Sequence, residues 1–341
     1  MPYPAKSSPA PIPLSTDWQK DMQTAFRRLD ALLAYLLLDP NQAPSPLLAD
    51  PDFPILVPRS FADRMIKGNW NDPILLQVLP LAAEIAATTG FQNDAVGDLA
   101  SQILPGLLHK YASRALLMVS PQCAIHCRYC FRREFPYGDL PRGQAGWDEA
   151  WEYLSSAEGI KEIIFSGGDP LFLDNRRLAS LLEKALALPY IRTLRFHTRL
   201  PVVLPSRIEP QLLELFRAAA GEKTLIVVIH ANHPNEIDEE CAQALAALRS
   251  TGAILLNQTV LLKDVNDQAE PLAELSRRLI QNGVLPYYLH QLDRVTGTAH
   301  FEVEENRGRE LVEELRSLLP GYAVPKYVRE IAGEAHKTPL L

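Results

Sequence analysis

The chain has few cysteines. Four occur in 341 residues, and three of them, Cys123, Cys127 and Cys130, lie in one short stretch. Three clustered thiols are odd in number and nothing marks the chain as secreted, so a disulfide framework fits the sequence poorly. Structural zinc sites usually take two separated Cys-x2-Cys pairs, or one pair followed by His-x3-5-His, and the sequence has neither. Cys241 lies in a helical pattern, and we expect it in the core.

Long apolar runs and positive charge are also lacking. No run of about 18 apolar residues is present, so we expect no membrane span. The net charge of −7, the pI near 5.7 and the absence of a basic stripe argue against nucleic acid as a partner. A proline-rich stretch through Pro13 follows Met1 where a secretion signal would stand. We therefore expect a cytoplasmic protein, a location that suits an oxygen-sensitive metal site.

What the chain does have is a compact set of three soft ligands. The stretch Cys123-Ala-Ile-His-Cys127-Arg-Tyr-Cys130 follows an apolar run that predicts a strand. A structural zinc ion or an ordinary cubane cluster takes four protein ligands. Three thiols therefore predict a metal centre with one open position, where a ligand can bind. A zinc knuckle completed by His126 is the rival interpretation.

The first third of the chain predicts helices and an arm. Residues 1–15 hold five prolines and predict a flexible arm. Residues 16–106 predict a helical N-terminal domain with short helices cut by prolines. Apolar residues at spacings of three and four predict one helix that begins at Thr16 or Asp17 and ends before Pro40.

From Leu107 the pattern alternates between short apolar runs and amphipathic stretches. Candidate strands are 114–120, 162–166, 193–197, 225–229, 254–260 and 284–289. Candidate helices lie at about 147–157, 175–188, 209–219, 237–251, 268–282 and 305–319. Such alternation predicts an α/β fold with a parallel sheet. Six units are too few for a standard eight-stranded barrel, so we expect an incomplete (β/α)6 barrel over 107–303 and a C-terminal segment over 304–341.

The active site of such a barrel lies at the carboxyl ends of its strands. The three cysteines follow the first strand, and Gly167-Gly168-Asp169 follow the second, where paired glycines let backbone approach a ligand closely. Polar residues stand at the other strand ends: Arg195, His197, His230, Asn232, Asn257, Gln258, His290 and Asp293. So many of them around one mouth predict a site there.

The cysteine spacing, with Tyr129 before the last thiol, resembles the signature of radical S-adenosylmethionine enzymes. More of the chain resembles the lysine 2,3-aminomutase family within that class, and most closely its short branch, which serves elongation factor P. The resemblance extends from about Phe53 to the end. The stretches that carry it are 107–133, SGGDPL, LPVVLPSRI, HPNEI, LNQTVLLKDVND, LPYYLHQLD and the closing Lys-Thr-Pro.

The resemblance implies three cofactors. Cys123, Cys127 and Cys130 would hold a [4Fe–4S] cluster whose fourth iron binds S-adenosylmethionine. The adenosylmethionine side would be formed by Gly167, Gly168, Asp169, His230 and Gln258. Lys337 falls where the family lysine holds pyridoxal 5′-phosphate, whereas composition alone makes it an ordinary solvated tail residue. The phosphate and ring of that cofactor would be gripped by Lys110, Tyr111 and Arg114.

The resemblance also implies the substrate. Arg132 falls where an arginine binds the substrate carboxylate, a geometry that guanidinium suits. Asp293 and Glu330 occupy the two positions where lysine-specific members surround the substrate's ε-ammonium. Two acids favour a cationic side chain and would repel a carboxylate. The family's glycine run before the cofactor lysine is replaced here by Glu334-Ala335-His336, so we expect a stiffer loop and a different substrate pose. The C-terminal extension that the clostridial enzymes use in assembly has no counterpart in this sequence, so neither oligomeric state nor product hand is carried over from that branch.

We thus expect a lysine 2,3-aminomutase that makes β-lysine, of the R hand in this branch, for elongation factor P and its lysyl ligase. Flavodoxin or ferredoxin would be the reducing partner. A second hypothesis keeps the cofactors and changes the substrate to ornithine or glutamate. A third is a zinc-binding protein without turnover.

Overall fold

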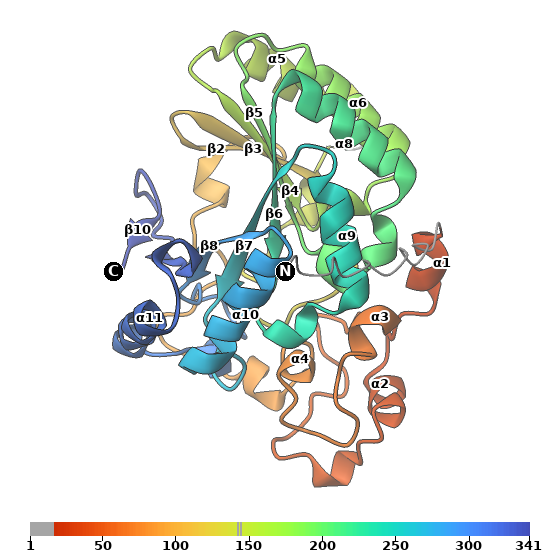
Figure 1. The fold of residues 1–341 in the computed structure, drawn as a ribbon, viewed down its shortest axis with the longest axis vertical. Helices are drawn as coiled ribbons and strands as arrows, with labels where there is room; N and C mark the ends of the chain where they lie inside the picture. The colour runs from red at the N-terminus through yellow and green to blue at the C-terminus, as the bar shows by residue number, and fades with distance from the viewer. Residues whose placement is uncertain (1–16, 142, 144) are drawn as a thin grey trace, which may run out of the picture.

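A computed structural model describes residues 17–141, 143 and 145–341, and its centre is a sheet whose strands stand in chain order (Figure 1). The strands of these residues are β1 (Gln102–Leu104), β2 (Leu107–Tyr111), β3 (Arg114–Ser120), β4 (Glu162–Gly167), β5 (Thr193–Thr198), β6 (Thr224–His230), β7 (Ile254–Val260), β8 (Leu285–His290), β9 (Lys326–Arg329) and β10 (Thr338–Pro339).

Strands β3 to β9 run parallel. Antiparallel pairing adds β2 and then β1 at one edge of the sheet and β10 at the other. The six predicted strands are β3 to β8, and all six are confirmed. The sequence did not predict β9, a seventh parallel strand that pairs with β8. Since β1 and β10 do not pair in this ten-stranded sheet, the described residues form an open barrel, as expected.

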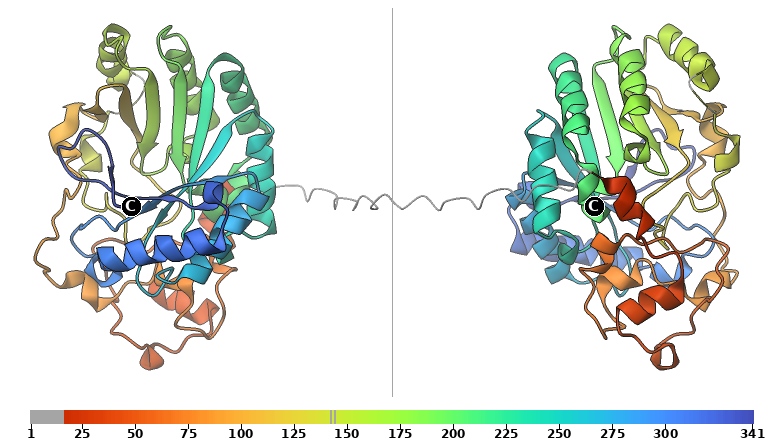
Figure 2. Two further views of the ribbon diagram at one scale, coloured as in Figure 1. Left: turned by 60° about the vertical axis from the view of Figure 1, so that its left-hand side comes forward. Right: turned by 90° about the vertical axis from the view of Figure 1, so that its right-hand side faces the viewer.

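Helices cover the outer face of the curved sheet (Figure 2). They are α5 (Asp148–Ser156), α6 (Asn175–Leu186), α8 (Pro210–Glu222), α9 (Glu239–Arg249), α10 (Ala269–Gln281) and α11 (Glu305–Leu318), close to the predicted ranges, with a short α7 (Leu200–Val203) after β5. Side chains alternate along a strand. Phe165 and Phe196 therefore point outward and stack at 4.7 Å, with Phe216 of α8 beside them. Cys241 is fully buried on α9, as predicted.

The N-terminal segment contains only short helices: α1 (Trp18–Gln23), α2 (Leu29–Tyr35), α3 (Arg59–Ala62) and α4 (Pro73–Leu76). The prediction of one helix up to Pro40 was wrong. Asp17 does cap α1, but Phe26 exchanges backbone hydrogen bonds of 2.8 and 3.0 Å with Val57, which breaks the helix between α1 and α2. The predicted arm over residues 1–15 lies outside the described residues.

The N-terminal segment packs on the loop that carries the cysteines. The backbone N–H of His126 donates to Leu56 O, and that of Arg128 donates to Gln77 O, both over 2.9 Å. Moreover, β1 lies before residue 107 and pairs with β2, so the sheet begins ahead of the predicted domain boundary. The segment is thus part of the wall around the strand ends.

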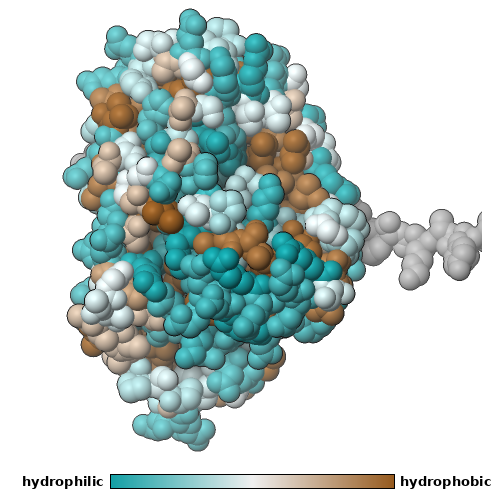
Figure 3. All heavy atoms as spheres, turned by 90° about the vertical axis from the view of Figure 1, so that its left-hand side faces the viewer, coloured by the Kyte–Doolittle hydropathy of each residue, from teal (hydrophilic) through white to brown (hydrophobic). Residues whose placement is uncertain are grey.

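The face that carries α11 and β10 is mostly hydrophilic, with small apolar patches between polar side chains (Figure 3). On α11 the exposed charges pair along the helix, for example Arg307 Nη1 with Glu314 Oε1 at 2.7 Å. In the described part of the chain, no helix combines the length and apolar character that crossing a membrane requires.

Candidate active site

A pocket of about 370 Å³ opens at the carboxyl ends of the parallel strands. It brings together all the residues to which the sequence analysis gave a cofactor, metal or substrate role, but Asn232 and Asn257, two of the polar residues expected at the mouth, do not line it. The residues with such a role are Lys110, Tyr111, Arg114, Cys123, Cys127, Cys130, Arg132, Gly167, Gly168, Asp169, His230, Gln258, Asp293, Glu330 and Lys337. The pocket has two ends, which we name the thiol end (Cys123, Cys127, Cys130) and the lysine end (Lys337).

The thiol end lies on the loop that leaves β3. Burial raises the pKa of the Cys130 thiol to about 11 and raises that of Cys123 as well, so a metal would have to displace protons to bind there. Among the described residues, no three His, Cys, Asp or Glu side chains meet around a point where one ion could sit. Each thiolate of a cubane binds a different iron, so a cluster does not require such convergence. Three thiols on one loop could therefore bind three irons of a cubane and leave the fourth iron open.

The glycine loop after β4 packs against the chain that leads into Cys123. A Cβ at Gly168 would lie 2.4 Å from Gln122 O, and one at Gly167, whose φ is +124°, would lie 2.4 Å from Ser120 O. Gly168 N–H donates to Ser120 O over 2.7 Å. Only glycine permits this approach. The observed role of the pair is therefore to allow close packing of the cysteine loop, and both glycines also line the pocket.

Both carboxylate oxygens of Asp169 accept hydrogen bonds from the protein itself. Its Oδ1 accepts from Leu171 N–H and from Thr198 Oγ1, and its Oδ2 accepts from the Arg199 N–H at 2.7 Å. Burial raises the pKa of Asp169 to about 6, against these hydrogen bonds. Asp169 thus ties the ends of β4 and β5 together below the thiols.

His230 and Gln258 stand side by side at the ends of β6 and β7, where their backbones pair. The His230 Nε2 lies 2.9 Å from Tyr129 Oη, and the two rings stack. Burial and the Arg199 charge lower the pKa of His230 to about 3, so the imidazole is neutral. The Gln258 side chain lines the pocket between the two ends.

The lysine end is built by the β9–β10 hairpin. Thr338 pairs with Arg329, which sets Lys337 opposite Glu330, and Leu340 is buried against Tyr327. Lys337 Nζ forms an ion pair with Glu330 Oε2. The C-terminal residues are thus an anchored edge of the sheet, and Lys337 is only 28% exposed.

Glu330 joins the two edges of the open sheet. Its Oε1 accepts from Tyr111 Oη at 2.5 Å and from Lys110 Nζ at 3.2 Å, and both donors belong to β2. Burial opposes its ionisation, yet Lys337, Tyr111 and Lys110 together hold the pKa of Glu330 below its usual value. Side chains of the site, rather than strand pairing, close the barrel here.

Asp98 is a residue of this end that the sequence did not single out. Its two oxygens bind Lys110 Nζ at 3.2 Å and Arg132 Nε at 2.8 Å. Arg132 also donates to Ser166 Oγ over 3.1 Å. The only signal in the sequence was an acid shortly before the first strand, and nothing in its spacing marks it.

Asp293 faces the same space without a hydrogen-bond partner for its carboxylate among the described residues. Burial raises the pKa of Asp293 to about 7, and the neighbouring Glu330 adds to the shift while Lys337 opposes it. An unpaired, half-buried acid beside a paired one is suited to receive a cation from outside.

Three buried side-chain nitrogens of the pocket have no hydrogen-bond partner among the described residues. Arg114 Nε lies 4.0 Å from Glu162, too far for a hydrogen bond, while its guanidinium covers the Tyr111 ring at 5.1 Å. His197 Nε2 and Arg199 Nε are the other two. Buried donors are normally satisfied, so these orphans point to a ligand that the pocket is made to hold. With Lys110 and Lys337 nearby, an anionic, carbonyl-bearing cofactor such as pyridoxal phosphate fits.

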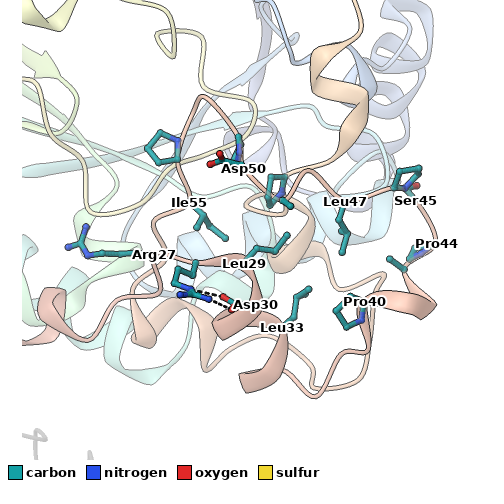
Figure 4. A pocket seen from close by; sticks show the side chains of 17 residues that line it. Arg27, Leu29, Asp30, Leu33, Pro40, Pro44, Ser45, Leu47, Asp50 and Ile55 are labelled. Carbon is teal, nitrogen blue, oxygen red and sulfur yellow. Dashed lines mark hydrogen bonds and ion pairs between the residues drawn. The ribbon is translucent and has the colours of Figure 1, made fainter.

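A larger hollow of about 870 Å³ lies on the N-terminal segment (Figure 4). Proline and aliphatic side chains dominate its lining, and the charges of Arg28 and Asp30 bind each other, with Nε and Oδ1 at 3.0 Å. No cysteine, histidine or lysine stands among the described residues that line it. The groups needed for chemistry are therefore at the strand ends.

Three thiols at the mouth of an open parallel barrel define a class of proteins with a single iron–sulfur cluster. In agreement, residues 112–191 match the family described as "4Fe-4S single cluster domain". A solved structure of coproporphyrinogen III oxidase from Escherichia coli, titled a radical SAM enzyme, is 14% identical with a TM-score of 0.40, over 66% of this chain and 54% of that one.

Two curated relatives narrow the class to a family. The chain is 47% identical to L-lysine 2,3-aminomutase of Escherichia coli K12 over 96% of its length and 95% of that protein. It is 42% identical to L-lysine 2,3-aminomutase of Haemophilus influenzae Rd over 94% and 95%. The chain belongs to the L-lysine 2,3-aminomutase family, and the predicted resemblance is confirmed.

Proposed function

We propose that this protein moves the α-amino group of L-lysine to the β-carbon and that it does so with a [4Fe–4S] cluster, S-adenosylmethionine and pyridoxal 5′-phosphate. One observation carries the proposal: three thiols and the Lys337 amine line the same pocket, and acids stand at the lysine end. The names of the two relatives agree with it.

When bound, the cluster and adenosylmethionine supply a carbon radical that removes a hydrogen, and pyridoxal phosphate supplies a carbonyl that takes an amino group. The chain's own residues bind and orient these groups. Cys123, Cys127 and Cys130 hold the cluster, and Lys337 holds pyridoxal phosphate. The Nε of Arg114, which has no partner within the protein, donates a hydrogen bond to the phosphate, a contact that guanidinium geometry favours.

The substrate is held at its two ends. Arg132 binds the carboxylate with the guanidinium N–H groups that Asp98 and Ser166 leave free, and Asp98 fixes its orientation. Asp293, ionised, binds the ε-ammonium, with Glu330 as the second acid. A side chain ending in a carboxylate would meet repulsion from both, so lysine is favoured over glutamate.

Finer parts of the proposal rest on the resemblance to the short branch of the family. The product is (R)-β-lysine, it is attached to elongation factor P by a lysyl ligase, and flavodoxin or ferredoxin delivers the electron. The protein works in the cytoplasm. No basic stripe that would bind nucleic acid was found in the sequence.

The test is a product assay under anaerobic conditions. Protein purified without oxygen is analysed for iron and acid-labile sulfide, reduced, and given adenosylmethionine, pyridoxal phosphate and, separately, L-lysine, L-ornithine and L-glutamate. We expect β-lysine from lysine and chiral analysis to give the R hand. Turnover of ornithine or glutamate in place of lysine would overturn the substrate, and zinc without iron or sulfide would overturn the cofactors.

A further inference from the structure

A buried arginine touches one cysteine of the thiol end. Arg199 follows β5, and its Nη1 donates to Cys127 Sγ over 2.7 Å. Its side chain is 8% exposed. Among the described residues, no side-chain N–H donates to the sulfur of Cys123 or Cys130. No motif in the sequence singles out Arg199, although it stands at a strand end like His197.

The arginine is held in place by groups other than the thiol. Its Nη2 donates to Glu236 Oε2 at 2.9 Å and to Gln77 Oε1 at 2.7 Å, and its backbone N–H binds Asp169. The guanidinium also lies 5.2 Å from the Phe61 ring. Because these contacts come from several elements, the donor stays aimed at Cys127 whether or not a cluster is bound.

The carboxylate partner is itself fully committed. Glu236 is completely buried, and its Oε1 accepts from the backbone N–H groups of Asn232 and His233 and from Gln77 Nε2. It cannot turn away and leave the arginine. Arginine stays charged at every working pH, so a permanent cation lies beside this one ligand position.

We infer that Arg199 donates an N–H···S hydrogen bond to the Cys127 thiolate of the bound cluster and thereby raises the cluster's reduction potential. Reduction adds one electron, taken from a low-potential one-electron carrier, and increases the negative charge on the sulfurs. A charged donor stabilises that state more than the oxidised one, and hydrogen bonds to cluster sulfurs are known to set the potential. Arg199 is thus a positioning residue that favours reduction of the cluster, the step that precedes cleavage of adenosylmethionine. The inference rests on the proposed cluster.

The experiment is a redox titration followed by the EPR signal of the reduced cluster. Arg199→Lys keeps the charge but is too short to reach both Cys127 and Glu236. We expect the reduced-to-oxidised ratio at a fixed potential to fall about tenfold, equivalent to 59 mV for one electron. The matched control is Arg64→Lys, since Arg64 is a buried arginine that donates to Asp238 and to the Glu236 carbonyl but touches no thiol. The reduction potential of the cluster in Arg64→Lys should equal that in the unaltered protein.

A second variant guards against misfolding. Arg199→Gln with Glu236→Gln removes both charges together, so no unpaired charge stays buried, and it should show the same negative shift. Unchanged potentials in cluster-loaded variants, an equal shift in Arg64→Lys, or failure of both Arg199 variants to hold iron would each overturn the inference. Absence of iron and sulfide from the unaltered protein would instead overturn the proposed function, and the inference with it.

Discussion

The thiol end and the lysine end of the pocket are built in different ways. At the thiol end, three ligands come from one loop, and the glycines of the next strand end seat that loop. At the lysine end, Glu330 meets Lys110, a residue 220 positions away along the chain. One end is therefore fixed by local geometry, and the other exists only when the whole sheet has formed.

The difference extends to the barrel itself. The thiol end sits on neighbouring strands of the parallel sheet, whereas the lysine end joins β2 to the residue after β9, across the open side of the barrel, through Tyr111, Lys110 and Glu330. Loss of one side chain at the lysine end should leave the thiol end intact. The following predictions test that independence.

The largest effect is expected at the thiol end. Cys127→Ala removes one of three cluster ligands, so iron and sulfide content and aminomutase activity should fall to background, while circular dichroism stays close to that of the unaltered protein. Cys241→Ala is the control, because that thiol is buried on α9 away from the pocket. It should keep the cluster and cost about 1 kcal/mol of stability. Full cluster occupancy in Cys127→Ala would refute the assignment.

Lys337→Ala tests the independence of the two ends from the lysine end of the pocket. Borohydride treatment should no longer attach a pyridoxyl group to the protein, because the amine that forms the bond is gone. Iron content and cleavage of adenosylmethionine by the reduced cluster should persist, since the thiol end does not depend on this side chain. Lys326→Ala, an exposed lysine of β9, is the control and should keep the adduct. Peptide mapping that locates the group on Lys326 would show that the cofactor lysine is misassigned.

The sequence predicted the thiol end and most of the sheet because both leave short-range signals. Strand β4 appears in the sequence as a short apolar run, and β5 shows a period of two in which Arg195 and His197 alternate with apolar residues, so both are visible over a few residues. The three cysteines are likewise adjacent in the chain. Strand β9 was missed because it has four residues with a charge at each end, and pairing with β8 and β10 determines it.

The residues of the lysine end could be predicted only from their match to single positions of the family. Lys337 carried no physical signal of its own, and resemblance alone pointed to it. The pairing of Glu330 with Lys337 and of Asp98 with Arg132 depends on tertiary contacts that no spacing encodes. The prediction of a single N-terminal helix was wrong for the same reason, because the backbone of Phe26 forms hydrogen bonds with the distant Val57.

A smaller effect is expected from the unpaired acid of the lysine end. Asp293→Asn removes the charge that would meet the substrate ammonium. The value of kcat/KM for lysine should fall by a factor that corresponds to a loss of about 2–5 kcal/mol of transition-state stabilisation. Pyridoxal phosphate binding and cluster content should not change. Glu304→Gln, which alters an exposed acid before α11, is the control and should be neutral. Unchanged lysine turnover in Asp293→Asn would remove the main physical support for lysine as substrate.

The smallest and sharpest test is the pH dependence of kcat/KM, which reports the free enzyme. Burial first, and then Glu330, raise the pKa of Asp293 to about 7, against the opposing charge of Lys337. Below that pKa the acid is neutral and cannot bind an ammonium. The value of kcat/KM for lysine should therefore rise about tenfold per pH unit up to about pH 7 and then level off. In Asp293→Asn this inflection should vanish while the thiol end, judged by the EPR signal of the reduced cluster, is unaltered. An inflection that survives in the variant would assign the titration to another group, such as the buried Asp169 whose pKa is about 6.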